Sequence, residues 1–192
     1  MKPAHFLGRV QAVALLGEDC ASYAGRVVLI SGAGGSIGSE LARQVLACRP
    51  AKLLLYELSE LALYHIEMEL RQQAEDGHVD LVPILGSITD PRQVRQVLVE
   101  HGVQVVIHAA AYKHVPLVEA NPLSGLTNNV LGTQTLAREA AEARVERFIL
   151  VSSDKAVRPV SVMGASKRLA ELVVQDLAAR SDGTIFTMVR FG

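Results

Sequence analysis

Six short apolar runs, separated by segments of helical spacing, recur along the chain from Arg26 onward. Each run is apolar at consecutive positions rather than at alternate ones, which is typical of a parallel strand buried on both faces. Strands that alternate with helices predict an α/β fold, a Rossmann-like doubly wound parallel sheet with its ligand crevice at the carboxyl ends of the strands. The predicted strands are 27–30, 53–56, 79–85, 105–107, 148–151 and 185–189.

Helix caps and helix breakers delimit the segments between these strands. Residues 1–24 show no clear period, so we predict a lead-in segment there and a single domain over 25–192. The predicted helices run from 37 to the break at Pro50, from the cap at Ser59 to Gly77, from Asp90-Pro91 to Gly102, from Asn121-Pro122 to about Arg144, and from the cap at Ser161 to about Arg180.

Composition limits the classes of function that remain. The chain has 192 residues, of which 49% are hydrophobic and 20% charged, and this fits one globular domain and excludes disorder. A net charge of −1 gives no basis for binding nucleic acid or an acidic membrane surface. Because no apolar segment reaches the ~20 residues of a membrane span and no signal-peptide pattern is present, we expect a cytoplasmic protein.

Two cysteines, Cys20 and Cys48, form no metal-binding or redox motif. We expect free, buried thiols in a reducing compartment, with a disulfide as the less favoured alternative. We predict no metal site.

The first strand runs directly into the glycine-rich segment Gly32-Ala33-Gly34-Gly35-Ser36-Ile37-Gly38, which opens a helix. In this context the segment predicts a dinucleotide-binding loop. Gly32 permits a tight turn, Gly35 lets the backbone approach a pyrophosphate, and Gly38 allows close packing of helix against strand. The N–H groups at Ser36 and Ile37 begin the helix and face the phosphates. We therefore predict that the domain over 25–192 binds NAD(P).

Glu57 ends the second strand, 25 positions after Gly32. A carboxylate at this point accepts hydrogen bonds from both ribose hydroxyls of the adenosine half and repels a 2′-phosphate. The residue therefore favours NAD over NADP, and NADP remains possible because a strand-end glutamate can also face solvent.

Residues at the ends of the third and fourth strands complete the predicted cofactor site. Ser87 and Ile88 follow the third strand and are placed to flank the adenine. Ala109 and Ala110 follow the fourth and offer small side chains where the backbone runs beside the cofactor. We interpret His108, just before them, as a hydrogen-bonded structural histidine rather than a catalyst.

A candidate catalytic set follows the fifth strand. Ser153 ends that strand, and Met163 and Lys167 are four positions apart, so both project from one face of the next helix. Short-chain dehydrogenases have a tyrosine and a lysine at this spacing, with a serine or threonine on the strand. Met163 stands at the tyrosine position, and its thioether cannot exchange a proton as a phenol does. From these residues alone, a non-catalytic NAD(P)-binding module stays an open alternative.

Four stretches together resemble the UDP-N-acetylglucosamine 4,6-dehydratases of bacterial polysaccharide and glycan biosynthesis, over nearly the whole chain from about Leu7. One branch of that family, with large membrane-anchored members, carries Ser-Met-Lys in place of Ser/Thr-Tyr-Lys. The Ser-Asp-Lys-Ala-Val stretch is the most specific part of the resemblance. The four stretches are 32–38, 108–116, 128–133, and 153–159 with 163–168.

The resemblance implies an internal redox reaction on a UDP-sugar. NAD(P)+ takes hydride from C4, a base removes the C5 proton, an acid protonates the departing C6 hydroxyl, and hydride returns to C6. By position, Asp154 is the acid and Lys155 the base, while Ser153 contacts the C4 oxygen and Lys167 holds the nicotinamide ribose. The lysine base needs a pKa well below about 10.4, and partial burial is expected to keep Asp154 partly protonated.

Two further residues are candidate substrate contacts. Lys113 lies on the crevice side of the loop after the fourth strand, where it can touch substrate or cofactor or serve only as an exposed charge. Asn129 is also a candidate, although a role in tying strand ends together by side-chain hydrogen bonds is favoured. A nucleotide-sugar epimerase is the alternative reaction, because it shares the cofactor loop and the ketone intermediate.

The resemblance also concerns the ends of the chain. In that family the strand at 189–192 continues into a lobe that binds the nucleotide sugar, and the longer members begin with membrane helices. This sequence contains neither, so we expect a C-terminally truncated chain that binds the cofactor, with its own turnover left open. We further expect a homo-oligomer.

Overall fold

A computed structural model gives the structure of the chain and describes residues 20–74 and 79–191. These residues form one six-stranded sheet in the order β3-β2-β1-β4-β5-β6, and every neighbouring pair of strands is parallel. The order reverses between β1 and β4, which is the switch point where Rossmann folds bind their ligands. The predicted doubly wound fold is therefore confirmed. The strands are β1 (Val27–Ser31), β2 (Lys52–Glu57), β3 (Asp80–Leu85), β4 (Val105–His108), β5 (Arg147–Ser153) and β6 (Ile185–Phe191).

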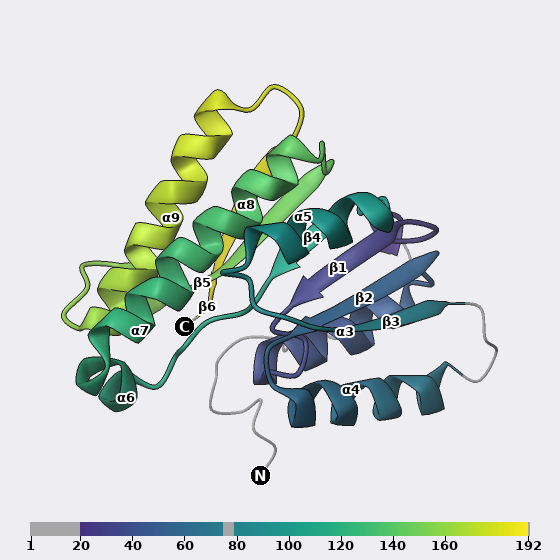
Figure 1. Cartoon of the computed structure of the whole chain (residues 1–192), viewed down its shortest axis with the longest axis horizontal. Helices are drawn as coiled ribbons and strands as arrows, with labels where there is room; N and C mark the ends of the chain where they lie inside the picture. The colour runs from purple at the N-terminus through teal and green to yellow at the C-terminus, as the bar shows by residue number, and fades with distance from the viewer. Residues whose placement is uncertain (1–19, 75–78, 192) are drawn as a thin grey trace, which may run out of the picture.

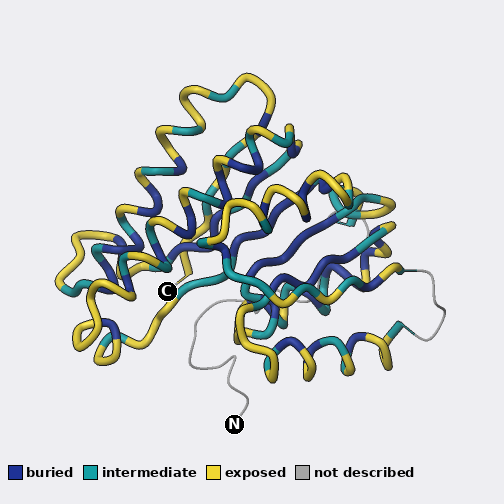
Figure 2. The backbone as a smooth tube through the Cα atoms, in the orientation of Figure 1, coloured by how far each residue is buried: buried dark blue, intermediate teal, exposed yellow. Residues whose placement is uncertain are grey.

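The central strands are buried on both faces, as their unbroken apolar runs predict (Figure 2). Successive residues of β1 point to opposite faces, so Leu29 joins one apolar cluster while Val28 and Ile30 join the other. Helices cover both faces (Figure 1). The first cluster lies under α5 (Pro91–Glu100), α8 (Gly132–Glu142) and α9 (Val162–Arg180), and the second under α3 (Ser36–Ala47) and α4 (Glu60–Gln73).

Three predicted helix caps are confirmed. The side chains of Ser59, Asp90 and Ser161 each accept a hydrogen bond from a backbone N–H in the first turn of α4, α5 and α9. The predicted end of α4 at Gly77 lies outside the described residues, as does most of the lead-in segment over 1–24. No helix within the described ranges is long and apolar enough to cross a membrane.

The long helix predicted from Pro122 is not uniform. It consists of α7 (Pro122–Leu126), a π-helical turn η1 (Thr127–Leu131) and α8. Two short elements were not predicted at all: α6 (Val115–Ala120) and a 3-10 turn η2 (Asp154–Ala156), both at the carboxyl end of the sheet.

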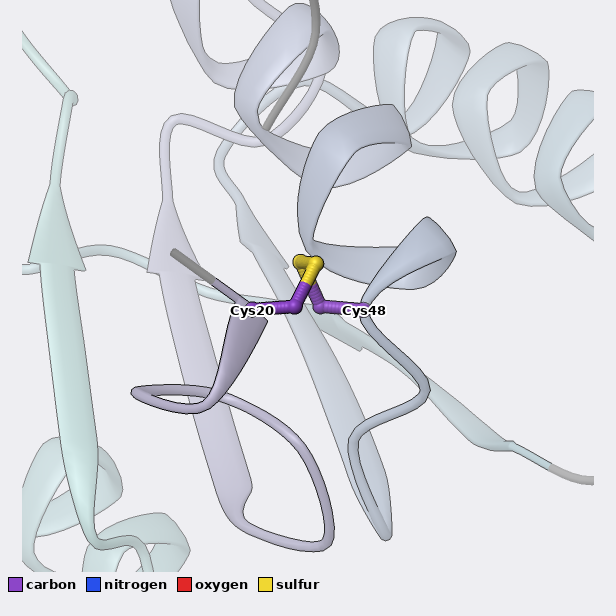
Figure 3. The surroundings of a disulfide bond; sticks show 2 residues. All are labelled: Cys20 and Cys48. Atoms are coloured by element: carbon purple, nitrogen blue, oxygen red, sulfur yellow. A yellow bond between two sulfur atoms is a disulfide. The ribbon is translucent and has the colours of Figure 1, made fainter. Parts of the chain in front are cut away.

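The expectation of free thiols is wrong. Cys20 and Cys48 form a disulfide, with Cα atoms 4.8 Å apart (Figure 3). Cys20 lies in the turn before β1, and Cys48 is the C-cap of α3, just before β2. In a β-α-β unit the helix returns the chain to the amino-terminal edge of the sheet, where the next parallel strand begins. Residues that precede two adjacent strands, such as Cys20 and Cys48, therefore become neighbours although they are 28 positions apart in sequence.

Candidate active site

The glycine-rich loop joins β1 to α3 at the switch point. Gly32 has φ 69°, and a Cβ added there would lie 2.6 Å from the Ala110 Cα. A Cβ on Gly38 would lie 2.0 Å from the carbonyl oxygen of Gly32, so α3 can approach the loop only without a side chain there. The first N–H groups of α3, as in any helix, have no intrahelical partner. Gly35 is the N-cap and has no side chain that could accept from them. Such a helix end is suited to an anion.

Glu57 fastens this loop to the end of β2. One carboxylate oxygen accepts the Gly34 N–H at 3.0 Å, and the other accepts the N–H groups of Leu58 and Ser59 at 2.9 and 3.0 Å. The predicted ribose-binding carboxylate therefore also shapes the loop. Its partners were not predictable from the sequence, because they are backbone groups.

A cavity of about 290 Å³ opens beside Glu57. The Tyr56 hydroxyl, buried behind it, donates to the carbonyl oxygen of Ser87 at 3.0 Å and fixes the segment after β3. This tyrosine was not singled out in the sequence. The cavity brings together most of the residues predicted to hold the cofactor, namely Gly32, Gly35, Glu57, Ser87, Ile88, Ala109 and Ala110.

A second cavity, of about 230 Å³, lies on the other side of the switch point and shares Ala109 and Ala111 with the first. Ser153, Lys155, Met163 and Lys167 line it, so four of the five predicted catalytic residues face one space. Ile37, Lys113 and Phe191 contribute to the same lining. No phenol, imidazole or carboxylate group lines this cavity among the described residues. Its only titratable lining groups there are the three lysine amines.

Asp154, the fifth predicted catalytic residue, begins η2 directly after Ser153. Its Oδ1 accepts the Ser153 hydroxyl at 2.9 Å and the Lys155 Nζ at 3.2 Å. The hydrogen bond from Ser153, and to a smaller extent the one from Lys155, hold the pKa of Asp154 below its usual value. The expected partial burial is wrong, because the strand has ended and η2 carries this side chain outward, where 56% of it is exposed. The structure therefore holds Asp154 as a carboxylate.

Lys167 is buried under Met163, one helical turn before it. The lysine is 8% exposed, and its Nζ donates to the carbonyl oxygen of Val151 at 2.8 Å. Burial lowers the pKa of Lys167 to about 8, and the negative charge of Glu171 opposes that change. The amine therefore titrates near neutrality at the floor of the cavity.

A chain of hydrogen bonds joins the ends of β1 and β4 to α8. His108 lies between the Ser31 hydroxyl (2.7 Å) and the Thr133 hydroxyl (2.8 Å). Thr133 donates its proton to the Asn129 carbonyl oxygen, so it accepts from His108 Nε2, and Nδ1 accepts from Ser31. Burial is the main cause that lowers the pKa of His108 to about 3, and the positive charge of Lys167 lowers it further. His108 is thus buried and hydrogen-bonded at both ring nitrogens, which agrees with its interpretation as a structural histidine.

Asn129 occupies the π-helical turn and is 1% exposed. Its amide donates to the Tyr112 carbonyl oxygen and the Ser166 hydroxyl, both at 2.9 Å, and accepts the Tyr112 N–H at 2.8 Å. The side chain thus ties the segment after β4 to α9, so it has a structural role, but it joins a strand end to a helix and not to another strand end. Its proposed contact with substrate stays a prediction.

Lys113 reaches back across the site to α3. Its Nζ lies 2.9 Å from the Ser36 hydroxyl, at the helix end where the cofactor phosphates are expected. This position favours a contact with the cofactor over the contact with substrate, although neither is tested. Two cavities of this size, joined at Ala109 and Ala111 below an uncapped helix N-terminus, fit the two halves of a nicotinamide dinucleotide.

Comparisons with known sequences agree with this arrangement. The family described as "Polysaccharide biosynthesis protein" matches residues 28–192. The chain is 40% identical to the capsular polysaccharide biosynthesis protein CapD of Staphylococcus aureus, over 97% of this chain and 32% of that protein. It is 29% identical to a UDP-N-acetylglucosamine 4,6-dehydratase (inverting) of Campylobacter jejuni, over 88% of this chain and 49% of that protein. A UDP-glucose 4-epimerase of Rickettsia typhi matches with the same identity and coverage.

Solved structures give the same fold. A dTDP-glucose 4,6-dehydratase from Streptomyces venezuelae, solved with NAD bound, superposes with a TM-score of 0.72 at 27% identity, over 85% of this chain and 54% of that one. The chain thus spans about a third to a half of the length of the curated relatives it matches.

Proposed function

Because the chain belongs to the family of polysaccharide biosynthesis proteins, we propose that it is the NAD-binding part of a UDP-N-acetylglucosamine 4,6-dehydratase. Its relatives include dehydratases and epimerases of nucleotide sugars. The observation that carries the proposal is the second cavity, where Ser153, Lys155 and Lys167 meet and Asp154 lies at the edge. An acid and a base beside a nicotinamide site are what removal of water across C5 and C6 requires.

The first cavity and the loop hold the cofactor in this proposal. Glu57 lies where a carboxylate binds the adenosine ribose and disfavours a 2′-phosphate, which supports NAD. The N-terminus of α3 and Lys113 offer N–H groups and a cation to the pyrophosphate. Bound NAD+ supplies reversible hydride acceptance, from C4 of the sugar and back to C6.

Ser153 and Asp154 offer a route for the C4 hydroxyl proton that needs no tyrosine at Met163. Ser153 takes that proton as its own passes to Asp154 Oδ1, 2.9 Å away. Asp154 is a carboxylate before this transfer and an acid after it, so it can then protonate the departing C6 hydroxyl. Ser153 keeps the proton from the C4 oxygen, and the released water gains the former Ser153 proton by way of Asp154, so this transfer balances.

Lys155 acts on C5 in the same sequence of steps. Its ammonium lies 3.2 Å from Asp154 Oδ1, and neutralising Asp154 removes the negative charge that stabilises the ammonium. The exposed ammonium then releases its proton to solvent, and the resulting amine takes the C5 proton. After hydride has returned to C6, the same group gives that proton back to C5 and regains one from solvent.

The test of the proposal is product formation by the chain continued by the C-terminal part of the Staphylococcus aureus relative. With UDP-N-acetylglucosamine and NAD, we expect a product lighter by one water, detected by mass spectrometry. Lys155→Met in the same protein is the matched control and should form none. NAD binding without any change in the sugar would contradict the proposal and favour a non-catalytic cofactor-binding module.

A UDP-sugar 4-epimerase is the second candidate, because epimerases of Rickettsia match at 29% identity over the same part of the chain. An epimerase also forms the 4-ketone, but it needs no acid at C6 and no base at C5. A product of unchanged mass with inverted C4 would establish epimerisation and reject the dehydratase.

A further inference from the structure

A buried carboxylate lies one helical turn beyond Lys167. Glu171 of α9 is fully buried, and its two oxygens accept four hydrogen bonds. The donors are the Ser152 hydroxyl at 2.7 Å, the Arg168 guanidinium at 2.8 Å, and two nitrogens of Arg190 at 2.7 Å each. Full burial of a charge is tolerated only with such complete pairing.

These bonds join three elements that each contribute to the second cavity. Ser152 precedes the cavity residue Ser153 on β5, and Arg190 precedes the cavity residue Phe191 on β6. Glu171 itself belongs to the helix that carries Met163 and Lys167. The carboxylate therefore fixes the walls of the cavity relative to one another.

The charge of Glu171 also acts on Lys167. The two side chains are four positions apart on one helix face, where Cβ atoms lie about 5–6 Å apart, and both are buried. Among the described residues, the titratable groups near the Lys167 amine also include His108 on β4, which is neutral, and the amines of Lys113 and Lys155, which line the same cavity. Among these neighbours Glu171 is the one that favours the ammonium form.

We propose that Glu171 is a positioning residue that keeps the Lys167 amine protonated and holds α9 against β5 and β6. Arg190 and Arg168 keep Glu171 ionised in turn, and Arg190 is the main cause of its pKa of about 2. The role does not depend on which sugar is bound or which reaction follows. It would hold for a dehydratase, an epimerase or a cofactor-binding module.

The test is the titration of Lys167 in the chain itself. The sequence has five lysines, so side-chain 13C resonances of labelled lysine can be followed from pH 6 to pH 11, and Lys167→Arg identifies the signal. The Glu171 charge favours the ammonium form of Lys167. Since the arginines offset part of this, we expect Glu171→Gln to lower the Lys167 pKa by at least about 0.5.

Glu139 provides the matched control. It is also buried, at 2% exposure, and paired with two arginines, Arg95 and Arg138, but it lies on α8. Glu139→Gln should destabilise the chain without moving the Lys167 pKa. A merely structural Glu171 would behave in the same way, so equal Lys167 pKa values in the two variants would overturn the proposal.

Arg190→Gln tests the sign of the effect and covers the case in which Glu171→Gln does not fold. Arg190 is partly exposed, and the Ser152 and Arg168 donors to Glu171 remain in this variant, so we expect it to fold with a lowered Tm. Removing this cation leaves Glu171 ionised through Arg168, and the unmasked negative charge should raise the Lys167 pKa. A lowered or unchanged value would contradict the electrostatic role.

Discussion

From the disulfide we predict how much reduction lowers the thermal stability of the chain. Cys20 and Cys48 are 28 positions apart and enclose β1, the glycine-rich loop and α3. Closing a loop of 28 residues lowers the entropy of the unfolded chain by about 12 cal/mol/K, which stabilises the folded chain by about 3.6 kcal/mol at 25 °C. In a chain of this size each kcal/mol moves the melting temperature by about 2–4 °C. Reduction should therefore lower the Tm by about 7–14 °C.

The assay is thermal unfolding followed by circular dichroism, with and without a reductant. Cys20→Ala with Cys48→Ala is the control, since its Tm should not respond to the reductant. Thiol titration in denaturant, before reduction, must find no free thiol. Two free thiols at that step would show that the bond does not form. An unchanged Tm after proven reduction would refute the loop-closure reasoning.

Three further predictions concern the cofactor and the reaction. Gly35→Asp should leave the Tm unchanged or raised, because Gly35 is the N-cap of α3 with φ −74° and aspartate is a good cap. Its NAD affinity should fall about a thousandfold, since two like charges about 4 Å apart repel by about 4 kcal/mol. An unchanged Kd for NAD would reject the phosphate site. The chain should bind NAD more tightly than NADP by calorimetry, and Glu57→Gln should narrow that difference; tighter NADP binding would show that Glu57 does not face the ribose. In the chain continued by the C-terminal part of the Staphylococcus aureus relative, Lys155→Met should abolish deuterium uptake at C5 from heavy water while bound NAD is still partly reduced. In the same protein, Asp154→Asn should slow water loss about 10²–10⁴-fold. Normal C5 exchange in the Lys155 variant, or full-rate dehydration in the Asp154 variant, would show that the residue does not have the proposed role.

The fold was predictable because its signals are local. Unbroken apolar runs such as Val28–Ile30 require burial on both faces, and the caps at Ser59, Asp90 and Ser161 mark the helix starts without reference to the rest of the chain. The residues that line the cofactor cavity follow from the same reasoning, since they stand at the carboxyl ends of predicted strands.

What could not be predicted depends on contacts between distant segments. Cys20 and Cys48 meet only because the β-α-β unit returns the chain to its starting edge. The π-helical turn allows Asn129 to reach Tyr112 and Ser166, and no helix propensity encodes that. The pair Asn128-Asn129 inside a predicted helix was the one available signal for it.

The sequence and the structure lead to different protonation states for Asp154, and this difference bears on the mechanism. An acid at C6 needs a proton, and burial is the usual means of keeping a carboxyl protonated. The structure instead exposes Asp154 and surrounds it with the donors Ser153 and Lys155, which keep it ionised. In the proposed reaction the proton then arrives during turnover, and the hydrogen bond from Ser153 offers it a route from the C4 hydroxyl. The proposed reaction therefore does not need a tyrosine in place of Met163, because Ser153 accepts the C4 proton and passes its own proton to Asp154, which needs one in the later step.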